Sequence, residues 1–103
     1  MDYKQIAAEI IKNVGGRSNI ISATHCMTRL RLVLADERRA DDDAVGRING
    51  VLSVIKQGGQ YQIVIGNTVP KVYREIIAMG VPAEKSDRRD DDGKSGEKKE
   101  KQG

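Results

Sequence analysis

The sequence has no tryptophan and no phenylalanine, and only three of its 103 residues are tyrosine. A core must therefore be built from Ile, Val, Leu and Ala. Few aromatic side chains are available to stack on nucleic-acid bases. The single cysteine excludes an intramolecular disulfide framework and indicates a reducing compartment. No apolar run approaches the roughly 20 residues of a membrane helix, so we expect neither a spanning segment nor a signal peptide.

The composition divides the chain after Pro82. Residues 83–103 contain seven Lys or Arg and seven Asp or Glu, and no aliphatic side chain larger than alanine. Such a segment cannot bury enough apolar surface to offset its conformational entropy, so we expect a disordered, charged linker or tail. One domain is predicted over residues 1–82, which carry the whole net charge of +3.

Apolar residues at helical spacing predict three helices. The first covers about residues 2–14, where Asp2 precedes the periodic segment and Gly15 follows it. A short second helix that runs to Asn49 is expected at Asp41, Asp42 and Asp43, because carboxylates favour the positive end of a helix. The third begins after residue 67 and stops before residue 80, with a proline that the first helical turn tolerates.

Two segments rich in β-branched residues lie between these helices. Residues 19–35 alternate with period two but exceed a usual strand, so we divide them at a tight turn near His25-Cys26-Met27. Residues 51–57 and 60–65 flank Gly58-Gly59, a pair suited to a two-residue hairpin turn. The order α-β-β-α-β-β-α predicts an α+β fold, in which three helices pack on one face of a four-stranded antiparallel sheet.

The chemically reactive side chains gather at the first of these turns, where His25 and Cys26 are the only histidine and the only cysteine. A thiol reacts as its thiolate, and nearby cations and backbone amides lower its pKa. Arg29 and Arg31 follow at period two, so both guanidinium groups are expected on one strand face, close to the sulfur. Guanidinium groups and turn amides together suit a phosphoryl group carried on that sulfur.

Each of these residues also has a plainer interpretation. Cys26 alone is most often a small packed hydrophobe, and strand arginines most often form a solvated face. Neighbouring strand residues point to opposite faces, which favours a structural or partner-contact role for His25 over contact with the sulfur. One Cys beside one His falls short of the about four convergent ligands of a usual zinc centre, so no metal site is predicted.

A specific family resemblance adds to this chemistry. The phosphorylation-site signature of enzyme IIB domains of the phosphoenolpyruvate-dependent sugar phosphotransferase system closely resembles residues 24–31, Thr-His-Cys-Met-Thr-Arg-Leu-Arg. The likeness lies in the glucose, sucrose and β-glucoside superfamily and extends over residues 10–79. His25 and the segment 57–61, Gln-Gly-Gly-Gln-Tyr, are most similar to the β-glucoside and sucrose branch.

The resemblance implies a phosphotransferase component that uses no metal or organic cofactor. Cys26 would accept a phosphoryl group from a phosphohistidine of a IIA domain and pass it to a sugar bound by the membrane IIC domain. Arg29 and Arg31 match the family positions that act in the transfer to sugar. We add the hypothesis that the Thr28 hydroxyl and the amides of Met27 and Thr28 contact phosphate oxygens.

The resemblance also implies a place in the cell and a range of sugars. The domain would lie on the cytoplasmic side of the membrane, tethered through IIC. The sugar would be a β-glucoside, sucrose, trehalose or N-acetylmuramic acid.

Two functions of other classes stay open. The positive charge of residues 1–82 is compatible with a small module that binds RNA or another polyanion, but the shortage of aromatic residues means that no nucleic-acid partner is expected. A thiol redox sensor would also use Cys26, although the chain has no second cysteine to resolve an oxidised one.

Overall fold

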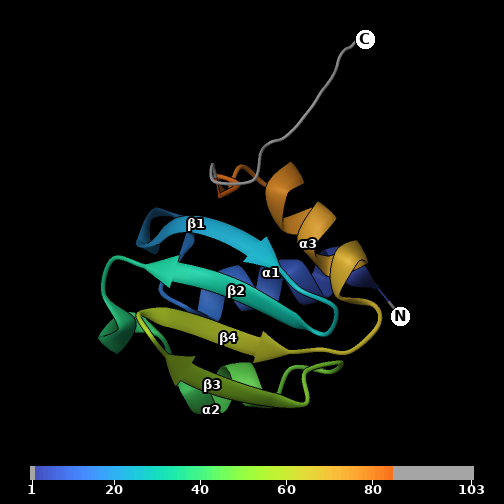
Figure 1. The fold of residues 1–103 in the computed structure, drawn as a ribbon, viewed down its shortest axis with the longest axis horizontal. Coiled ribbons are helices and arrows are strands. Elements are labelled where there is room, and N and C mark those ends of the chain that lie inside the picture. Colours follow the sequence, from blue (N-terminus) through green and yellow to red (C-terminus); the bar gives the residue numbers. More distant parts are fainter. Residues whose placement is uncertain (1, 85–103) are drawn as a thin grey trace, which may run out of the picture.

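The computed structural model describes residues 2–84, so the predicted tail from residue 85 onward lies outside the described residues (Figure 1). The seven main elements follow the predicted order and confirm the α+β class: α1 (Tyr3–Asn13), β1 (Ile20–His25), β2 (Arg29–Leu34), α2 (Asp42–Gly46), β3 (Ser53–Gln57), β4 (Gln60–Val64) and α3 (Val69–Ala78). Two short 3₁₀ turns that the sequence did not indicate are η1 (Arg17–Asn19) and η2 (Glu37–Arg39). Within residues 2–84, no helix combines the length and apolar character needed to cross a bilayer.

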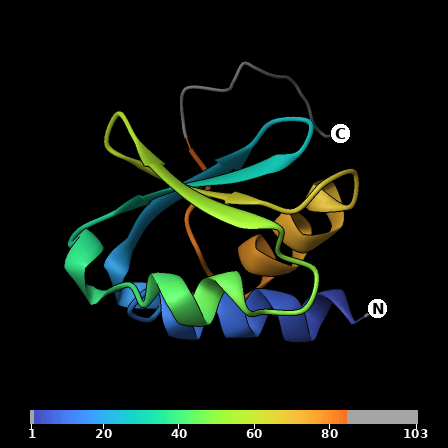
Figure 2. The ribbon, with the colours of Figure 1, turned by 90° about the horizontal axis from the view of Figure 1, so that it is seen from below.

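All four strands form one antiparallel sheet in the order β1-β2-β4-β3. The two hairpins therefore meet through β2 and β4, where Leu30 pairs with Ile63 and Arg31 with Gln62. Figure 2 shows α1, α2 and α3 gathered beneath one face of this sheet. We call the opposite side of the sheet, which no described helix covers, the open face.

The core lies between the sheet and the helices. Along β2, the fully buried Leu30 and Leu32 alternate with half-buried residues, as the period-two pattern predicts. Burying one such aliphatic side chain is worth about 1.5–3 kcal/mol. The buried apolar residues are Ile6, Ala7, Ile10, Val14, Ile20, Ala23, Leu30, Leu32, Leu34, Val45, Ile48, Tyr61, Ile63, Ile65, Val69, Val72, Ile76 and Val81.

The second helix is shorter than the sequence predicts. The expected end at Asn49 is wrong, because α2 ends at Gly46. From there the backbone tightens: the amide of Ile48 donates to the carbonyl of Val45, three residues back, at 3.1 Å. This tighter turn places the Ile48 side chain in the core, where only 5% of its surface is exposed.

A polar contact holds α2 against the second hairpin. The Tyr61 hydroxyl donates to the Asp42 carboxylate at 2.8 Å, and the Lys56 ammonium lies 2.9 Å from the other oxygen of that carboxylate. Burial and the neighbouring carboxylate raise the pKa of Tyr61, so the hydroxyl stays protonated and keeps donating.

The chain that follows α3 returns to the outer edge of β1. The amide of Ala23 donates to the carbonyl of Pro82, and the amide of Glu84 donates to the carbonyl of Ala23, both at 2.9 Å. Ala23 and Ala83 form a parallel bridge. The described fold therefore continues two residues beyond Pro82, and this short segment pairs with an edge that would otherwise be unpaired.

Candidate functional site

The connection between β1 and β2 consists of residues 26–28, where the sequence predicted a turn. His25 and Leu30 form the last strand pair before it. The amide of Cys26 donates to the carbonyl of Arg29 at 3.0 Å and closes the hairpin. The single cysteine thus lies at the tip of a strand pair whose other end is anchored in the core.

The segment after β4 holds this turn from outside. The carbonyl of Thr28 accepts hydrogen bonds from the amides of Ile65 and Gly66, both at 2.9 Å. In a trans peptide the C=O and N–H groups point in opposite directions. Anchoring the Thr28 carbonyl on one side therefore directs the amide of Arg29 to the other side, toward the Cys26 sulfur.

The surroundings of Cys26 lower the pKa of its thiol. The largest cause is a hydrogen bond from the backbone amide of Thr28, and burial opposes it. The amide of Arg29 and the guanidinium group of Arg31, by hydrogen bond and by charge, lower the pKa further. Because Cys26 is only half-buried, the stabilised thiolate stays within reach of another molecule.

The two arginines lie on the same strand face but act differently. Both are half-buried on β2, where they alternate with the core leucines and so point to the open face. The Arg29 guanidinium donates to the side-chain oxygen of Gln62 at 2.9 Å. The expectation that both guanidinium groups act on the sulfur is therefore corrected: Arg31 does so, whereas Arg29 contributes its backbone amide.

Gln62 is the site residue that sequence reasoning missed. It lies on β4 directly opposite Arg31, and only 5% of its surface is exposed. Its oxygen accepts from Arg29, and its amide nitrogen donates to the Gln60 side chain at 3.0 Å. The alternation of β4 predicts a polar residue there, but only the pairing of β4 with β2 brings it to the arginines.

The His25 ring lies between the Cys26 carbonyl and helix α3. Its Nδ1 lies 2.8 Å from the carbonyl oxygen of Cys26. On the other side its ring meets Tyr73 of α3, with the ring centroids 4.7 Å apart and the planes tilted by 54°. The strand alternation favours a structural role for His25 over contact with the sulfur, and the contacts described here are structural ones.

An open pocket lies beside the cysteine, lined by His25, Cys26, Met27, Asn67 and Pro70. The Met27 side chain is 85% exposed, an unusual position for so apolar a group. Thr28 is also exposed. The turn therefore brings together a half-buried sulfur, two exposed neighbours and, from the loop after β4, the residues that complete the pocket.

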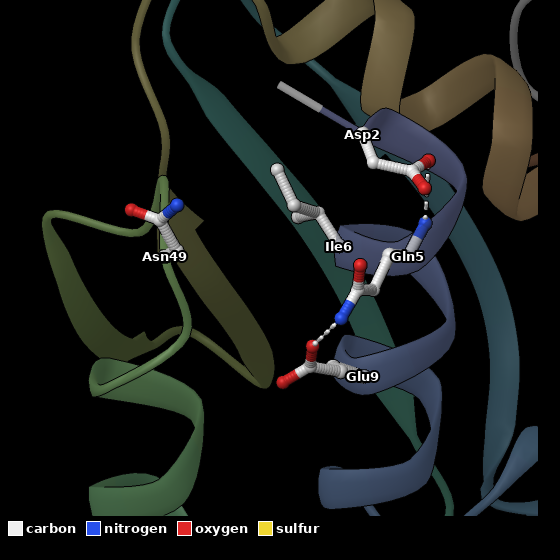
Figure 3. A pocket seen from close by; sticks show the side chains of 5 residues that line it. All are labelled: Asp2, Gln5, Ile6, Glu9 and Asn49. Atoms are coloured by element: carbon white, nitrogen blue, oxygen red, sulfur yellow. Dashed lines mark hydrogen bonds between the residues drawn. The ribbon is translucent and has the colours of Figure 1, made fainter.

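A second pocket lies near the start of α1, apart from the cysteine turn (Figure 3). Within it, Asp2 accepts from the amide of Gln5, and the Gln5 side chain donates to Glu9. These polar groups satisfy one another, with Ile6 and Asn49 completing the wall. The lining of this pocket contains no cysteine, histidine or arginine. In the range 2–84, the structure holds no group of three or more Cys, His, Asp or Glu side chains suited to a metal ion.

Comparison with known proteins identifies relatives of this chain. A family model described as phosphotransferase system, EIIB matches residues 8–41. A β-glucoside-specific EIIBCA component of Halalkalibacterium halodurans is 50% identical over 80 residues, which cover 78% of this chain and 13% of the relative. A sucrose-specific EIIBC component of Klebsiella pneumoniae is 47% identical over 83 residues, 79% of this chain and 18% of the relative.

A solved structure agrees with these sequence relatives. One domain of the phosphotransferase-system IIABC component from Clostridium difficile superposes with a TM-score of 0.78 at 41% identity, covering 86% of this chain and 94% of that one. The present chain spans less than a fifth of the length of the two curated relatives.

Proposed function

The chain belongs to the EIIB family of the phosphotransferase system, in its β-glucoside and sucrose branch, and on that premise we propose that Cys26 carries a phosphoryl group on its way to a sugar. The observation that most supports this role is the convergence of the Thr28 and Arg29 amides and the Arg31 guanidinium on one half-buried sulfur. Lowering the pKa of a thiol raises the share of thiolate, its nucleophilic form, at a given pH.

The proposed reaction has two steps. In the first, the Cys26 thiolate attacks the phosphorus of a phosphohistidine on a IIA domain. The S–P bond forms, the N–P bond breaks, and its electron pair returns to the imidazole. In the second, a sugar hydroxyl attacks the phosphorus, its proton passes to a base at the acceptor site, and the S–P bond breaks with its electrons on the sulfur. Both displacements need in-line positioning and charge stabilisation more than covalent assistance.

Residues of the turn and of β2 have separate tasks in our proposal. Arg31 and the amides of Met27 and Thr28 hold phosphoryl oxygens, and the exposed Thr28 hydroxyl adds another donor. A phosphoryl group carries more negative charge than the thiolate it replaces, so the same donors bind it more strongly. Arg29 keeps its guanidinium near Gln62 and acts in the delivery of the phosphoryl group to sugar.

The partners follow from the two steps. A IIA domain is the donor, and a membrane IIC domain with bound sugar is the acceptor. The relatives are named as β-glucoside-specific and sucrose-specific components, so these sugars come first, with trehalose and N-acetylmuramic acid as further members of the class. We propose that the chain works as a phosphotransferase component at the cytoplasmic face of the membrane.

The experiment that tests this function is phosphorylation by a IIA donor. The chain is mixed with a phosphorylated IIA domain from a β-glucoside system, and the products are analysed by intact mass and peptide mapping. One phosphoryl group on Cys26 is expected. The same donor must phosphorylate an established EIIB domain as a control. If it does and Cys26 remains unmodified, the proposed function is wrong.

A further inference from the structure

We propose that His25 is a positioning residue for phosphoryl transfer: by holding the Cys26 carbonyl, it orients the Cys26–Met27 peptide and directs the Met27 amide toward the phosphoryl group. The inference rests on the proposed role of Cys26 and deepens it. It assigns a task to the only histidine of the chain, which directly precedes Cys26.

The contact itself defines which ring nitrogen carries the hydrogen. Nδ1 of His25 lies 2.8 Å from the Cys26 carbonyl oxygen, and a carbonyl oxygen can only accept. Nδ1 must therefore carry a hydrogen, which leaves Nε2 as the bare nitrogen of the neutral ring. Since the protonated ring also has a hydrogen on Nδ1, the bond persists whether His25 is charged or not.

The ring is fixed from its other side by α3. Tyr73 packs against it with a centroid separation of 4.7 Å and a tilt of 54°, a favourable geometry for an aromatic pair. His25 is half-buried between this helix and the turn. A side chain with a contact on each side has little rotamer freedom, so the Nδ1 hydrogen stays directed at the carbonyl.

Fixing that carbonyl fixes the next amide. The C=O of Cys26 and the N–H of Met27 belong to one planar trans peptide and point in opposite directions. His25 lies on the helix side of the sheet, so the Met27 amide is directed to the open face. Arg31, which hydrogen-bonds the sulfur, lies on that face. The Met27 amide therefore joins the donors that face a phosphoryl group on Cys26.

The Cys26–Met27 peptide is held by a side chain, that of His25. The neighbouring Thr28 carbonyl is anchored by the backbone amides of Ile65 and Gly66, which substitution of His25 leaves in place. The polar contact of the His25 ring is with the carbonyl oxygen of Cys26 and not with its thiol. Loss of its ring should consequently slow phosphoryl transfer while the thiol ionises at nearly the same pH, a combination that a direct acid–base role of His25 would not produce.

The test compares two substitutions in the full chain. His25→Leu removes the donor but keeps a similar volume, whereas His25→Asn places an amide N–H close to the position of Nδ1. We measure the rate of phosphoryl transfer from a IIA donor and the pH midpoint of Cys26 alkylation. His25→Leu should be slower by about threefold to tenfold, the scale of one hydrogen bond, and His25→Asn should stay within about twofold of the parent. The alkylation midpoint should stay close to that of the parent in both variants.

Three results would overturn the proposal: full-rate transfer by His25→Leu, no rescue by His25→Asn, or a His25 ring that nitrogen NMR shows to carry its hydrogen on Nε2 alone. The NMR measurement uses the unphosphorylated parent chain, so it tests the hydrogen bond from His25 to the Cys26 carbonyl even where a variant does not fold. If the parent accepts no phosphoryl group, the proposed function fails, while the NMR result still reports separately on the His25 contact.

Discussion

The sheet has two hairpin turns of opposite construction. Gly58 and Gly59 join β3 to β4 with φ angles of 61° and 79°, and a Cβ added to either glycine would meet nothing within 4 Å. The turn at residues 26–28 joins β1 to β2 without any glycine. It is held instead by Ile65, Gly66 and the ring of His25.

The difference separates turns that reverse the chain from turns that carry chemistry. Two residues tolerant of positive φ suffice to reverse a chain, because that requirement is local. Surrounding a sulfur with donors demands fixed directions for backbone amides, and such preorganisation comes from bonds to other parts of the fold. The glycine turn therefore serves as an internal reference for the cysteine turn.

The most severe test removes the sulfur. Cys26→Ser should abolish phosphoryl transfer from IIA through this chain to sugar, because serine, with its far higher pKa, provides no comparable anion at neutral pH. Transfer is measured in a reconstituted system with IIA and IIC, and circular dichroism checks that the variant folds. If Cys26→Ser phosphorylates sugar at the parent rate, another residue carries the phosphoryl group, and the cysteine turn has no chemical role that the glycine turn lacks.

The next largest effect is expected at Arg29. Arg29→Lys should lower the rate of sugar phosphorylation by roughly 100-fold, the scale of losing one preorganised donor, because lysine lacks the planar fork of the guanidinium. Acceptance of the phosphoryl group from IIA should change much less, since Arg29 supports the sulfur through its backbone amide. Single-turnover measurements separate the two steps, and equal losses in both would refute this division.

The thiol pKa distinguishes the two arginines. In the parent chain the pKa of Cys26 is lowered, so alkylation should reach half its maximal rate at a lower pH than for a free thiol. Arg31→Gln should move this midpoint upward, because it removes a hydrogen bond and a positive charge from the sulfur. Arg29→Gln, the matched control, keeps its backbone amide and should leave the midpoint in place. Equal shifts in both variants would contradict the assignment.

The same lowered pKa affects stability with a defined sign. A thiol that ionises more readily in the folded state than in the unfolded state stabilises the fold at high pH, and this contribution disappears as the pH falls through the folded-state pKa. The free energy of unfolding of the parent, relative to that of Cys26→Ser, should therefore rise with pH across this window. Urea denaturation at a series of pH values measures the difference, and a constant difference would argue against the lowered pKa.

The smallest effect on chemistry is expected at the glycine turn. Gly59→Ala should cost about 1–2 kcal/mol of unfolding free energy, because alanine is strained at a φ of 79°. The alkylation midpoint of Cys26 and the rate of phosphoryl acceptance should not change. If this substitution alters either, the two turns are coupled through β4 and the glycine turn is not an independent reference.

The order of elements, the α+β class and the position of Cys26 at a turn could be predicted from the sequence, and the structure confirms them. The end of α2 could not, because the tighter turn is tied to burial of Ile48 in a core assembled from distant segments. The separate partners of Arg29 and Arg31 also escaped prediction, since period two places both on one face without saying which group each meets.

Local spacing along the chain determined where helices, strands and turns begin, because hydrophobic period, capping and positive φ depend on residues a few positions apart. The tertiary structure alone decided which donors reach the sulfur. Arg29 meets Gln62 across 33 positions of sequence, and the Thr28 carbonyl meets amides that follow β4. Those contacts exist because β2 pairs with β4, and a strand's own pattern of alternation does not specify its neighbour.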